Sequence, residues 1–342
     1  MAGDLVLLTG GTGMIGFRTL VDLVQAGYNV RAAVRTQAGF DRISSLKPLA
    51  PYRSQVDGII VPDITAPGAY DEAVKGVKYV VHVASPLGSS AVDSEEAFQT
   101  EIIQPAIRGT VGILESAHKV SGIERIVITG SILSIVSLAA LVSGIKINEK
   151  TRATETEGPF ASSILAYAAS KALAHQATEK FIAEKRPAFS IVTILPAFVI
   201  GRDDTVTDPA DICKGTNGLL MGPLLGQARD QPLVGAVVHV DDVAKMHVLA
   251  LGPNIKGNQD YLASAHPNEA LDWADSFEIV KRRFPEAYAD GVFKFESIPR
   301  PVSVSVHVDS TKAEKDFGFK FKSFEEQTVS VVEHYLELLG RK

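Results

Sequence analysis

Cysteine is almost absent from this 342-residue chain, and the single Cys213 excludes an intramolecular disulfide and any cysteine-rich metal framework. This scarcity is typical of a reducing cytosol, and the simplest interpretation of Cys213 is a small buried apolar residue. An excess of basic residues is also absent, because the formal net charge is -6. The composition therefore predicts a soluble globular protein that binds neither nucleic acid nor an anionic membrane.

The chain lacks a long apolar run near its N-terminus, since Gly10 and Gly11 interrupt the run Leu5–Leu8. We therefore expect no secretion signal and a cytoplasmic location. The uncharged stretch Ile126–Ile145 is long enough to span a bilayer, but its hydroxyl residues and strand-like start favour a buried strand followed by an apolar wall beside a pocket. Metal-ligand spacing is missing too: the aspartates between residues 203 and 211 are irregularly placed and His82 is best interpreted as a packed strand residue, so no metal site is predicted.

Short apolar runs alternate with amphipathic stretches up to about residue 196. The runs are continuously apolar and rich in Val and Ile, which is typical of parallel strands covered on both faces. They are Leu5–Leu8, Asn29–Val34, Gly58–Val61, Tyr79–Val83, Arg125–Ile128 and Ser190–Leu195, and helices are expected near residues 14–26, 68–75, 94–119 and 162–185. This alternation predicts an α/β fold with a Rossmann-type, doubly wound parallel sheet.

The pattern changes after Pro196, where glycines, prolines and acidic residues follow one another up to Pro232. A strand at 234–240, a helix at 241–251 and a short strand at 261–263 then return to the sheet pattern. We expect residues 1–195 plus 236–264 to form the main Rossmann domain. Residues 196–235 plus 265–342 would form a smaller mixed α/β lobe that closes the substrate side.

A glycine-rich turn, Thr9-Gly10-Gly11-Thr12-Gly13-Met14-Ile15-Gly16, joins the first strand to the first helix. Gly10 permits a tight turn, Gly13 leaves room for a pyrophosphate, and Gly16 allows close packing of helix on sheet. Free N–H groups at the helix N-terminus favour negative charge. Any tight turn can use glycines, but a strand before, a helix after and a second strand on schedule favour a dinucleotide site.

The second strand ends in Arg35, where an NAD site usually carries an acidic residue for the ribose 2′-hydroxyl. A guanidinium suits the 2′-phosphate of NADP(H) instead. Arg42 and Lys47 follow, and each has the alternative interpretation of an ordinary solvated cation. The pattern predicts NADP(H) as cofactor, with Arg35 and Arg42 as phosphate ligands.

Tyr167 and Lys171 lie at i and i+4, where side chains on a helix are neighbours. A carbonyl that accepts a hydride needs a proton donor and fixed hydrogen-bond donors at its oxygen. A nearby ammonium is expected to lower the pKa of the tyrosine and make it a proton relay. The spacing alone also fits an amphipathic helix, but Ser131, at the carboxyl end of a strand, adds a hydroxyl where ligands gather in such folds.

Taken together, these residues resemble the extended short-chain dehydrogenases/reductases, in the branch of dihydroflavonol reductase, cinnamoyl-CoA reductase and methylglyoxal or carbonyl reductases. The resemblance covers nearly the whole chain. It rests on the segments 9–16, 30–35, Pro62-Asp63-Ile64-Thr65, 82–86, Thr129-Gly130-Ser131, 167–171 and 196–201.

The resemblance implies a role for each matching residue. Ser131 would steady the substrate oxygen, Tyr167 would donate the proton, and Lys171 would tune Tyr167 and hold the nicotinamide ribose. Besides Tyr167 and Lys171, the expected cofactor-binding residues are Thr9, Gly10, Thr12, Gly13, Met14, Ile15, Gly16, Arg35, Arg42, Asp63, Ile64, Ala84, Ser85, Pro86, Thr129, Pro196, Phe198 and Val199. Substrate contacts are expected from Leu87, Ser131, Ile132, Leu133, Phe160, Tyr167 and Phe198.

The chain departs from the family pattern at two positions. Arg108 stands in Pro105-Ala106-Ile107-Arg108-Gly109 where relatives often carry an asparagine that supports a water-linked proton relay. Gly130 stands where many relatives have a second serine. The usual relay is therefore in doubt, while the three catalytic groups remain.

The sequence predicts an NADPH-dependent carbonyl reductase that converts an aldehyde or ketone, of α-dicarbonyl or keto-ester type, to an alcohol. The alternatives are a hydroxysteroid or flavonoid-type NADP oxidoreductase, a nucleotide-sugar epimerase, and a regulator that senses dinucleotide without chemistry. The expected partner is a small carbonyl compound, and the choice between monomer and homodimer stays open.

Overall fold

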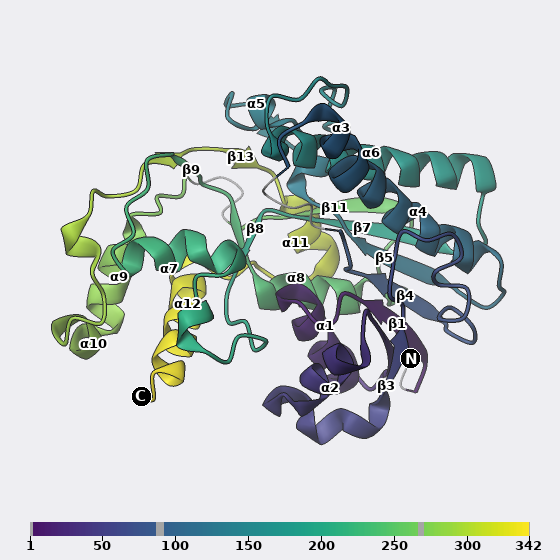
Figure 1. Cartoon of the computed structure of the whole chain (residues 1–342), viewed down its shortest axis with the longest axis horizontal. Coiled ribbons are helices and arrows are strands. Elements are labelled where there is room, and N and C mark those ends of the chain that lie inside the picture. Colours follow the sequence, from purple (N-terminus) through teal and green to yellow (C-terminus); the bar gives the residue numbers. More distant parts are fainter. Residues whose placement is uncertain (1–2, 87–91, 266–269, 342) are drawn as a thin grey trace.

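The computed structural model describes residues 3–86, 92–265 and 270–341. A seven-stranded parallel sheet in the order β11-β7-β5-β4-β1-β2-β3 forms its centre (Figure 1). The strands are β1 (Leu5–Thr9), β2 (Asn29–Val34), β3 (Val56–Ile60), β4 (Tyr79–His82), β5 (Arg125–Thr129), β7 (Ser190–Pro196) and β11 (Gln259–Ala263). The chain starts in the middle of the sheet and winds outward in both directions, which confirms the predicted doubly wound fold.

Helices cover both faces of the sheet because successive residues of each strand point to opposite sides. Val6 and Leu8 pack in the same cluster as residues of α1 (Met14–Gln25) and α8 (Val240–Leu249). Leu7, between them, packs on the other face with α4 (Gln104–His118) and α6 (Ser163–Lys185). α2 (Gln37–Ser45) follows β2. Gly27, just after the end of α1, has φ +88°, the left-handed conformation expected after a helix end.

Two predicted helices differ in the structure. Residues 68–75 form hydrogen-bonded turns instead of a helix, with Gly68 at φ +70°. The expected helix 94–119 is interrupted: α3 (Glu95–Ala97) leads into π-helical turns over Phe98–Ile103, and α4 starts only at Gln104. Pro105 has no N–H to donate to an upstream carbonyl, so the regular α-helical hydrogen bonds cannot continue through this point.

A second group of helices gathers beside the sheet (Figure 1). It consists of α7 (Gly218–Leu224), α9 (Asp275–Arg283), α10 (Pro285–Ala289) and α12 (Phe324–Leu338). They share an apolar core built around Trp273, Phe277 and Phe295, against which the half-buried Cys213 packs. α11 (Thr311–Phe317) instead joins the sheet's own core through Ala313 and Phe317. The division into 1–195 plus 236–264 and 196–235 plus 265–342 stays a prediction.

Short parallel strand pairs connect the two groups of elements. They are β8 (Phe198–Ile200) with β10 (Val237–His239), β9 (Leu233–Val234) with β12 (Ser303–Val304), and β6 (Lys146–Ile147) with β13 (His307–Val308). Between β5 and β6 lies α5 (Leu138–Leu141), so the uncharged stretch 126–145 forms a buried strand and a short helix. Within the described ranges, no helix is sufficiently long and apolar to cross a membrane.

Candidate active site

A cavity of about 1310 Å³ opens at the carboxyl ends of the sheet strands. This is the edge at which ligands bind in open α/β sheets. All the residues expected to bind cofactor line this one cavity: Thr9, Gly10, Thr12, Gly13, Met14, Ile15, Gly16, Arg35, Arg42, Asp63, Ile64, Ala84, Ser85, Pro86, Thr129, Tyr167, Lys171, Pro196, Phe198 and Val199. The tertiary structure therefore brings together segments that are more than 180 residues apart in the sequence.

The glycines of the turn differ in how much room surrounds them. Gly10 has φ +76°, and a Cβ there would lie 2.6 Å from the backbone nitrogen of Ala84. A Cβ on Gly16 would lie 2.0 Å from the carbonyl oxygen of Gly10. A Cβ on Gly13 would meet nothing nearer than 3.9 Å, so protein packing does not demand this glycine.

Gly13 is the N-cap of α1 and offers no side-chain cap, which leaves the first N–H groups of the helix free beside the cavity. Backbone donors without a covering Cβ are what a diphosphate needs for close approach. The residues present therefore fit a dinucleotide.

Arg35 and Arg42 are placed differently. Arg35 is exposed at the end of β2 and lines the cavity. Arg42 also lines it, but its guanidinium donates to the carbonyl oxygens of Thr12 at 2.7 Å and Thr205 at 3.2 Å. Arg42 thus ties the glycine-rich turn to the loop after β8, and Arg35 is the cation better placed to receive a phosphate.

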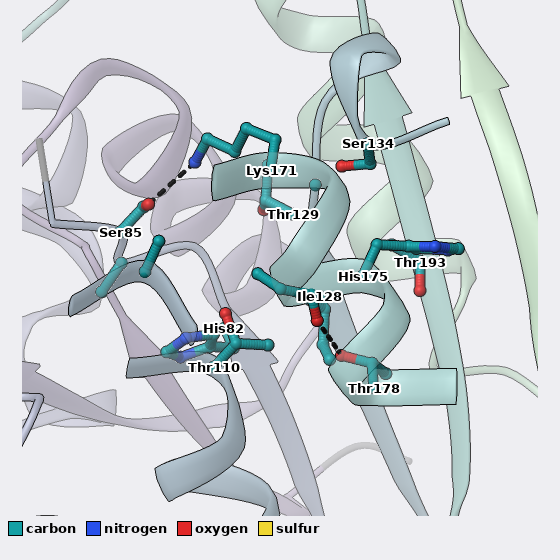
Figure 2. A pocket seen from close by; sticks show the side chains of 14 residues that line it. His82, Ser85, Thr110, Ile128, Thr129, Ser134, Lys171, His175, Thr178 and Thr193 are labelled. Carbon is teal, nitrogen blue, oxygen red and sulfur yellow. Dashed lines mark hydrogen bonds between the residues drawn. The ribbon is translucent and has the colours of Figure 1, made fainter. Parts of the chain in front are cut away.

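Ser131, Tyr167 and Lys171 all line the same cavity. Ser131 follows β5 and caps a 3₁₀ turn: its Oγ accepts the N–H of Leu133 at 3.2 Å, so its own hydrogen is left to donate to a ligand. Tyr167 and Lys171 lie one turn apart on α6, with Nζ 5.2 Å from the centre of the Tyr167 ring. The Nζ also donates to Ser85 Oγ at 2.8 Å, which anchors the lysine to the segment after β4 (Figure 2).

The pKa of Tyr167 is shifted in the direction opposite to the prediction. Burial raises the pKa of the phenol, because the phenolate would lose its contact with water. Burial also lowers the pKa of Lys171 to about 8. The expected lowering of the tyrosine pKa by the ammonium is therefore wrong for this structure, since desolvation is the cause of the shift in both groups.

A second, small cavity of about 30 Å³ lies behind Lys171, which lines both cavities (Figure 2). Its volume suits one or two water molecules. Thr110 and Ala106 line it, whereas Arg108, two residues from each, is exposed at the surface. Arg108 therefore offers no side-chain group to this small cavity.

His82 is a packed strand residue, as predicted: it is 2% exposed, its Nδ1 is 2.9 Å from Thr9 Oγ1, and its ring packs edge-on with Tyr70. Gly130 lies close to Leu195: a Cβ there would lie 2.7 Å from a terminal side-chain carbon of that residue, which would have to move to make room. The hydroxyl of Ser134 lies nearby instead and accepts the N–H of Ser131 at 3.1 Å.

The substrate-side predictions have a mixed outcome. Ser131, Ile132, Leu133, Tyr167 and Phe198 line the large cavity. Phe160 is not among its lining residues: it packs on the cluster of Val92, Phe98 and Ile102, on the other side of the Tyr167 ring. Leu87 lies outside the described residues.

Sequence reasoning missed several lining residues on this side. They are Leu138, Leu141, Ile164, Val234 and Ala236. From the apolar stretch 126–145, the sequence predicted Ile132 and Leu133 as lining residues but not Leu138 and Leu141. Ile164 could have been predicted, because a residue three positions before Tyr167 lies on the same helix face.

His175, which lines the small cavity but not the large one, brings atoms of metal-ligand type together with Glu179 and Asp260. Arg152 forms ion pairs with both carboxylates, at 2.8 Å to Glu179 and 3.5 Å to Asp260. The single guanidinium offsets one of the two acidic charges, and a carboxylate oxygen of Asp260 also lies 3.0 Å from His175 Nε2, so we interpret this cluster as an ion-pair network.

Comparison with known proteins agrees with this geometry. The family model described as "NAD dependent epimerase/dehydratase family" matches residues 6–263. The chain is 38% identical over 346 residues to ketoreductase CTB6 of Cercospora beticola, covering 99% of this chain and 96% of that protein. It is 30% identical over 302 residues to aldehyde reductase 2 of Sporidiobolus salmonicolor, covering 83% of this chain and 82% of that protein.

Among solved structures, the fold is similar to that of yeast methylglyoxal/isovaleraldehyde reductase Gre2 complexed with NADPH. The TM-score is 0.81 at 24% identity, covering 99% of this chain and 100% of that one. The resemblance drawn from the motifs is thereby confirmed, and the chain belongs to the NAD dependent epimerase/dehydratase family of extended short-chain dehydrogenases/reductases.

Proposed function

We propose that this protein is an NADPH-dependent carbonyl reductase that converts an aldehyde or ketone to an alcohol. The observation that carries the proposal is the convergence of Ser131, Tyr167 and Lys171 on a cavity that continues to the glycine-rich turn. Relatives named ketoreductase and aldehyde reductase support the reaction type. An α-dicarbonyl compound or keto ester is the substrate type we favour.

The choice of NADPH over NADH rests on Arg35. Its exposed guanidinium at the end of β2 can form charge-assisted hydrogen bonds with a 2′-phosphate. The Gre2 structure, which was determined with NADPH, supports the same choice.

In the proposed mechanism, bound NADPH supplies the hydride. Ser131 Oγ–H donates to the carbonyl oxygen and stabilises the negative charge that develops there. Tyr167 Oη delivers the proton, and its raised pKa keeps the phenol protonated near neutral pH. Lys171 Nζ, fixed by Ser85, places a positive charge behind the tyrosine ring and would contact the nicotinamide ribose.

The test is Tyr167→Phe, with NADPH consumption measured over a panel of aldehydes, α-keto esters and dicarbonyls. We expect turnover to fall by at least about a hundredfold, the usual contribution of a positioned acid, while NADPH still binds. Tyr70→Phe is the matched control, because Tyr70 lines the same cavity and its hydroxyl has no proposed role in catalysis. Substantial residual reduction by Tyr167→Phe would rule out the assigned proton donor.

A nucleotide-sugar epimerase is the second candidate, since the matched family is described as containing epimerases. Such an enzyme would retain its dinucleotide through purification. Release of bound NAD on denaturation, with no reduction of simple carbonyls, would favour it. The predominantly apolar wall near Tyr167 suits a nucleotide sugar poorly.

A further inference from the structure

An apolar wall extends from the Tyr167 ring along the substrate side of the cavity. Leu133, Leu138, Leu141, Val234 and Ala236 line the cavity, and all five belong to the apolar cluster against which Tyr167 packs. Leu133 and Leu141 are buried, so this wall is a fixed part of the protein interior. A substrate carbonyl at Tyr167 would therefore have one of its substituents on apolar surface.

Ile164 is an exposed apolar residue that lines the same cavity as this wall. It is 52% exposed, and it lies on the same face of α6 as Tyr167, three residues away. Val142 and Ile145, which follow α5 directly, are also exposed. Single exposed apolar side chains are ordinary, but Ile164 combines exposure with a place in the wall of the site.

Charge is concentrated away from this wall. In the described part of the cavity lining, the charged residues are Arg35, Arg42, Asp63, Lys171, Asp203 and Lys214. The first three belong to the segments after β2 and β3, and Lys171 is bonded to Ser85.

The two remaining charged residues, Asp203 and Lys214, lie between β8 and α7 and contact neighbouring residues of that same segment. The Asp203 carboxylate accepts the N–H of Thr205 at 3.0 Å and its hydroxyl at 2.7 Å. Lys214 forms an ion pair with Asp211 at 2.8 Å. Neither residue belongs to the apolar cluster that packs against Tyr167.

We propose that the substrate is an aldehyde or ketone with an extended, uncharged apolar substituent, and that Ile164 sets the length of substituent the site covers. The chain of the substituent lies over Leu133 and Leu141 and passes Ile164 to reach solvent. This inference rests on the proposed reductase function and adds the substrate class to it.

The experiment measures kcat/KM with NADPH for unbranched aldehydes and methyl ketones of increasing chain length. Burial of each methylene is expected to raise kcat/KM by about fourfold until the chain passes Ile164, after which the increase stops. Ile164→Ser should lower kcat/KM for the long substrates and leave the short ones unchanged, with most of the change in KM. Ile164→Trp should make the increase stop at a shorter chain.

Val142→Ser is the matched control, since Val142 is 48% exposed and is not a lining residue. It should leave the whole length dependence unchanged. A flat length dependence in the unmodified protein, or an equal loss at all lengths in Ile164→Ser, would overturn the assignment of the apolar wall while leaving the reductase function intact. Failure to reduce any carbonyl compound would instead overturn the proposed function, and this inference with it.

Discussion

The roles of Gly16 and Gly13 can be separated by experiment, because packing demands Gly16, whereas we expect Gly13 to be needed only for the bound dinucleotide. A Cβ on Gly16 would lie 2.0 Å from the backbone oxygen of Gly10, 1 Å inside the 3.0 Å limit of real Cβ contacts. Backbone cannot rotate aside as a side chain can. Gly16→Ala should therefore destabilise the unliganded protein by about 3 kcal/mol, the upper part of the range for overpacking.

Gly13→Ala should behave in the opposite way. Gly13 has φ -107° and ψ 171°, an extended conformation open to any residue, and the added Cβ would have its nearest neighbour at 3.9 Å. Alanine is a poorer N-cap than glycine but reduces the freedom of the unfolded chain, so the net change in unfolding free energy should stay below about 1 kcal/mol. The new methyl group would occupy the space into which we expect the diphosphate to fit, and NADPH affinity should be lost.

The assays are urea unfolding of each unliganded variant and a titration with NADPH. Gly16→Ala should unfold at lower urea concentration than the unmodified protein, and Gly13→Ala at nearly the same concentration. The reasoning would be refuted if Gly13→Ala bound NADPH normally, or if Gly16→Ala were as stable as the parent.

Three further predictions concern charge and burial. Arg35→Glu should weaken the binding of NADPH at least about tenfold more than the binding of NADH, as expected for loss of a charge-assisted hydrogen bond. Arg42→Ala should weaken the binding of both cofactors alike, because Arg42 donates to backbone carbonyls. If the NADPH-to-NADH affinity ratio were the same in the two variants, the phosphate role of Arg35 would be rejected. Burial lowers the pKa of Lys171 to about 8, so the unfolded protein binds the lysine proton more tightly than the folded protein does, and the charged lysine destabilises the fold below pH 8. Lys171→Met removes this charge and should stabilise the unliganded protein by up to about 3 kcal/mol below pH 8. That advantage should shrink as pH rises toward the ordinary lysine pKa, and a gain independent of pH in urea unfolding would contradict it. Tyr70→Phe should be neutral or stabilising by about 1 kcal/mol, because the Tyr70 hydroxyl is buried without a hydrogen-bond partner among the residues that the structure describes. A measured loss of stability would mean that the hydroxyl is bonded, for example to water.

Much of the sheet could be predicted from the sequence because its signals are local. β2 occupies Asn29–Val34 as predicted, and the other sheet strands lie within one or two residues of their expected positions. A run of apolar residues of strand length between turn-forming residues is a property of a few neighbours along the chain. The helix predicted at 68–75 was wrong, because its short apolar pattern did not show that Gly68 would adopt φ +70° within a series of hydrogen-bonded turns.

Side-chain environments were harder to predict because they depend on residues far apart in the chain. Arg42 seemed free for a phosphate, but the fold brings the Thr205 carbonyl to it from 163 residues away. Phe160 seemed to belong to the substrate pocket, yet it packs with the helical turns around Phe98. The pKa of Tyr167 rises because of surroundings that the spacing to Lys171 does not encode.

The sequence by itself determined the strand–turn–helix unit with its glycines and the one-turn spacing of Tyr167 and Lys171, since both follow from backbone geometry over a few residues. Only the tertiary structure decided that Ser131 shares a cavity with them, and that Leu133, Leu141 and Val234 belong to one apolar cluster beside the Tyr167 ring. The physical reason is that a cavity exists only where packing leaves space between elements, and that space is set by contacts between segments that are distant in the chain.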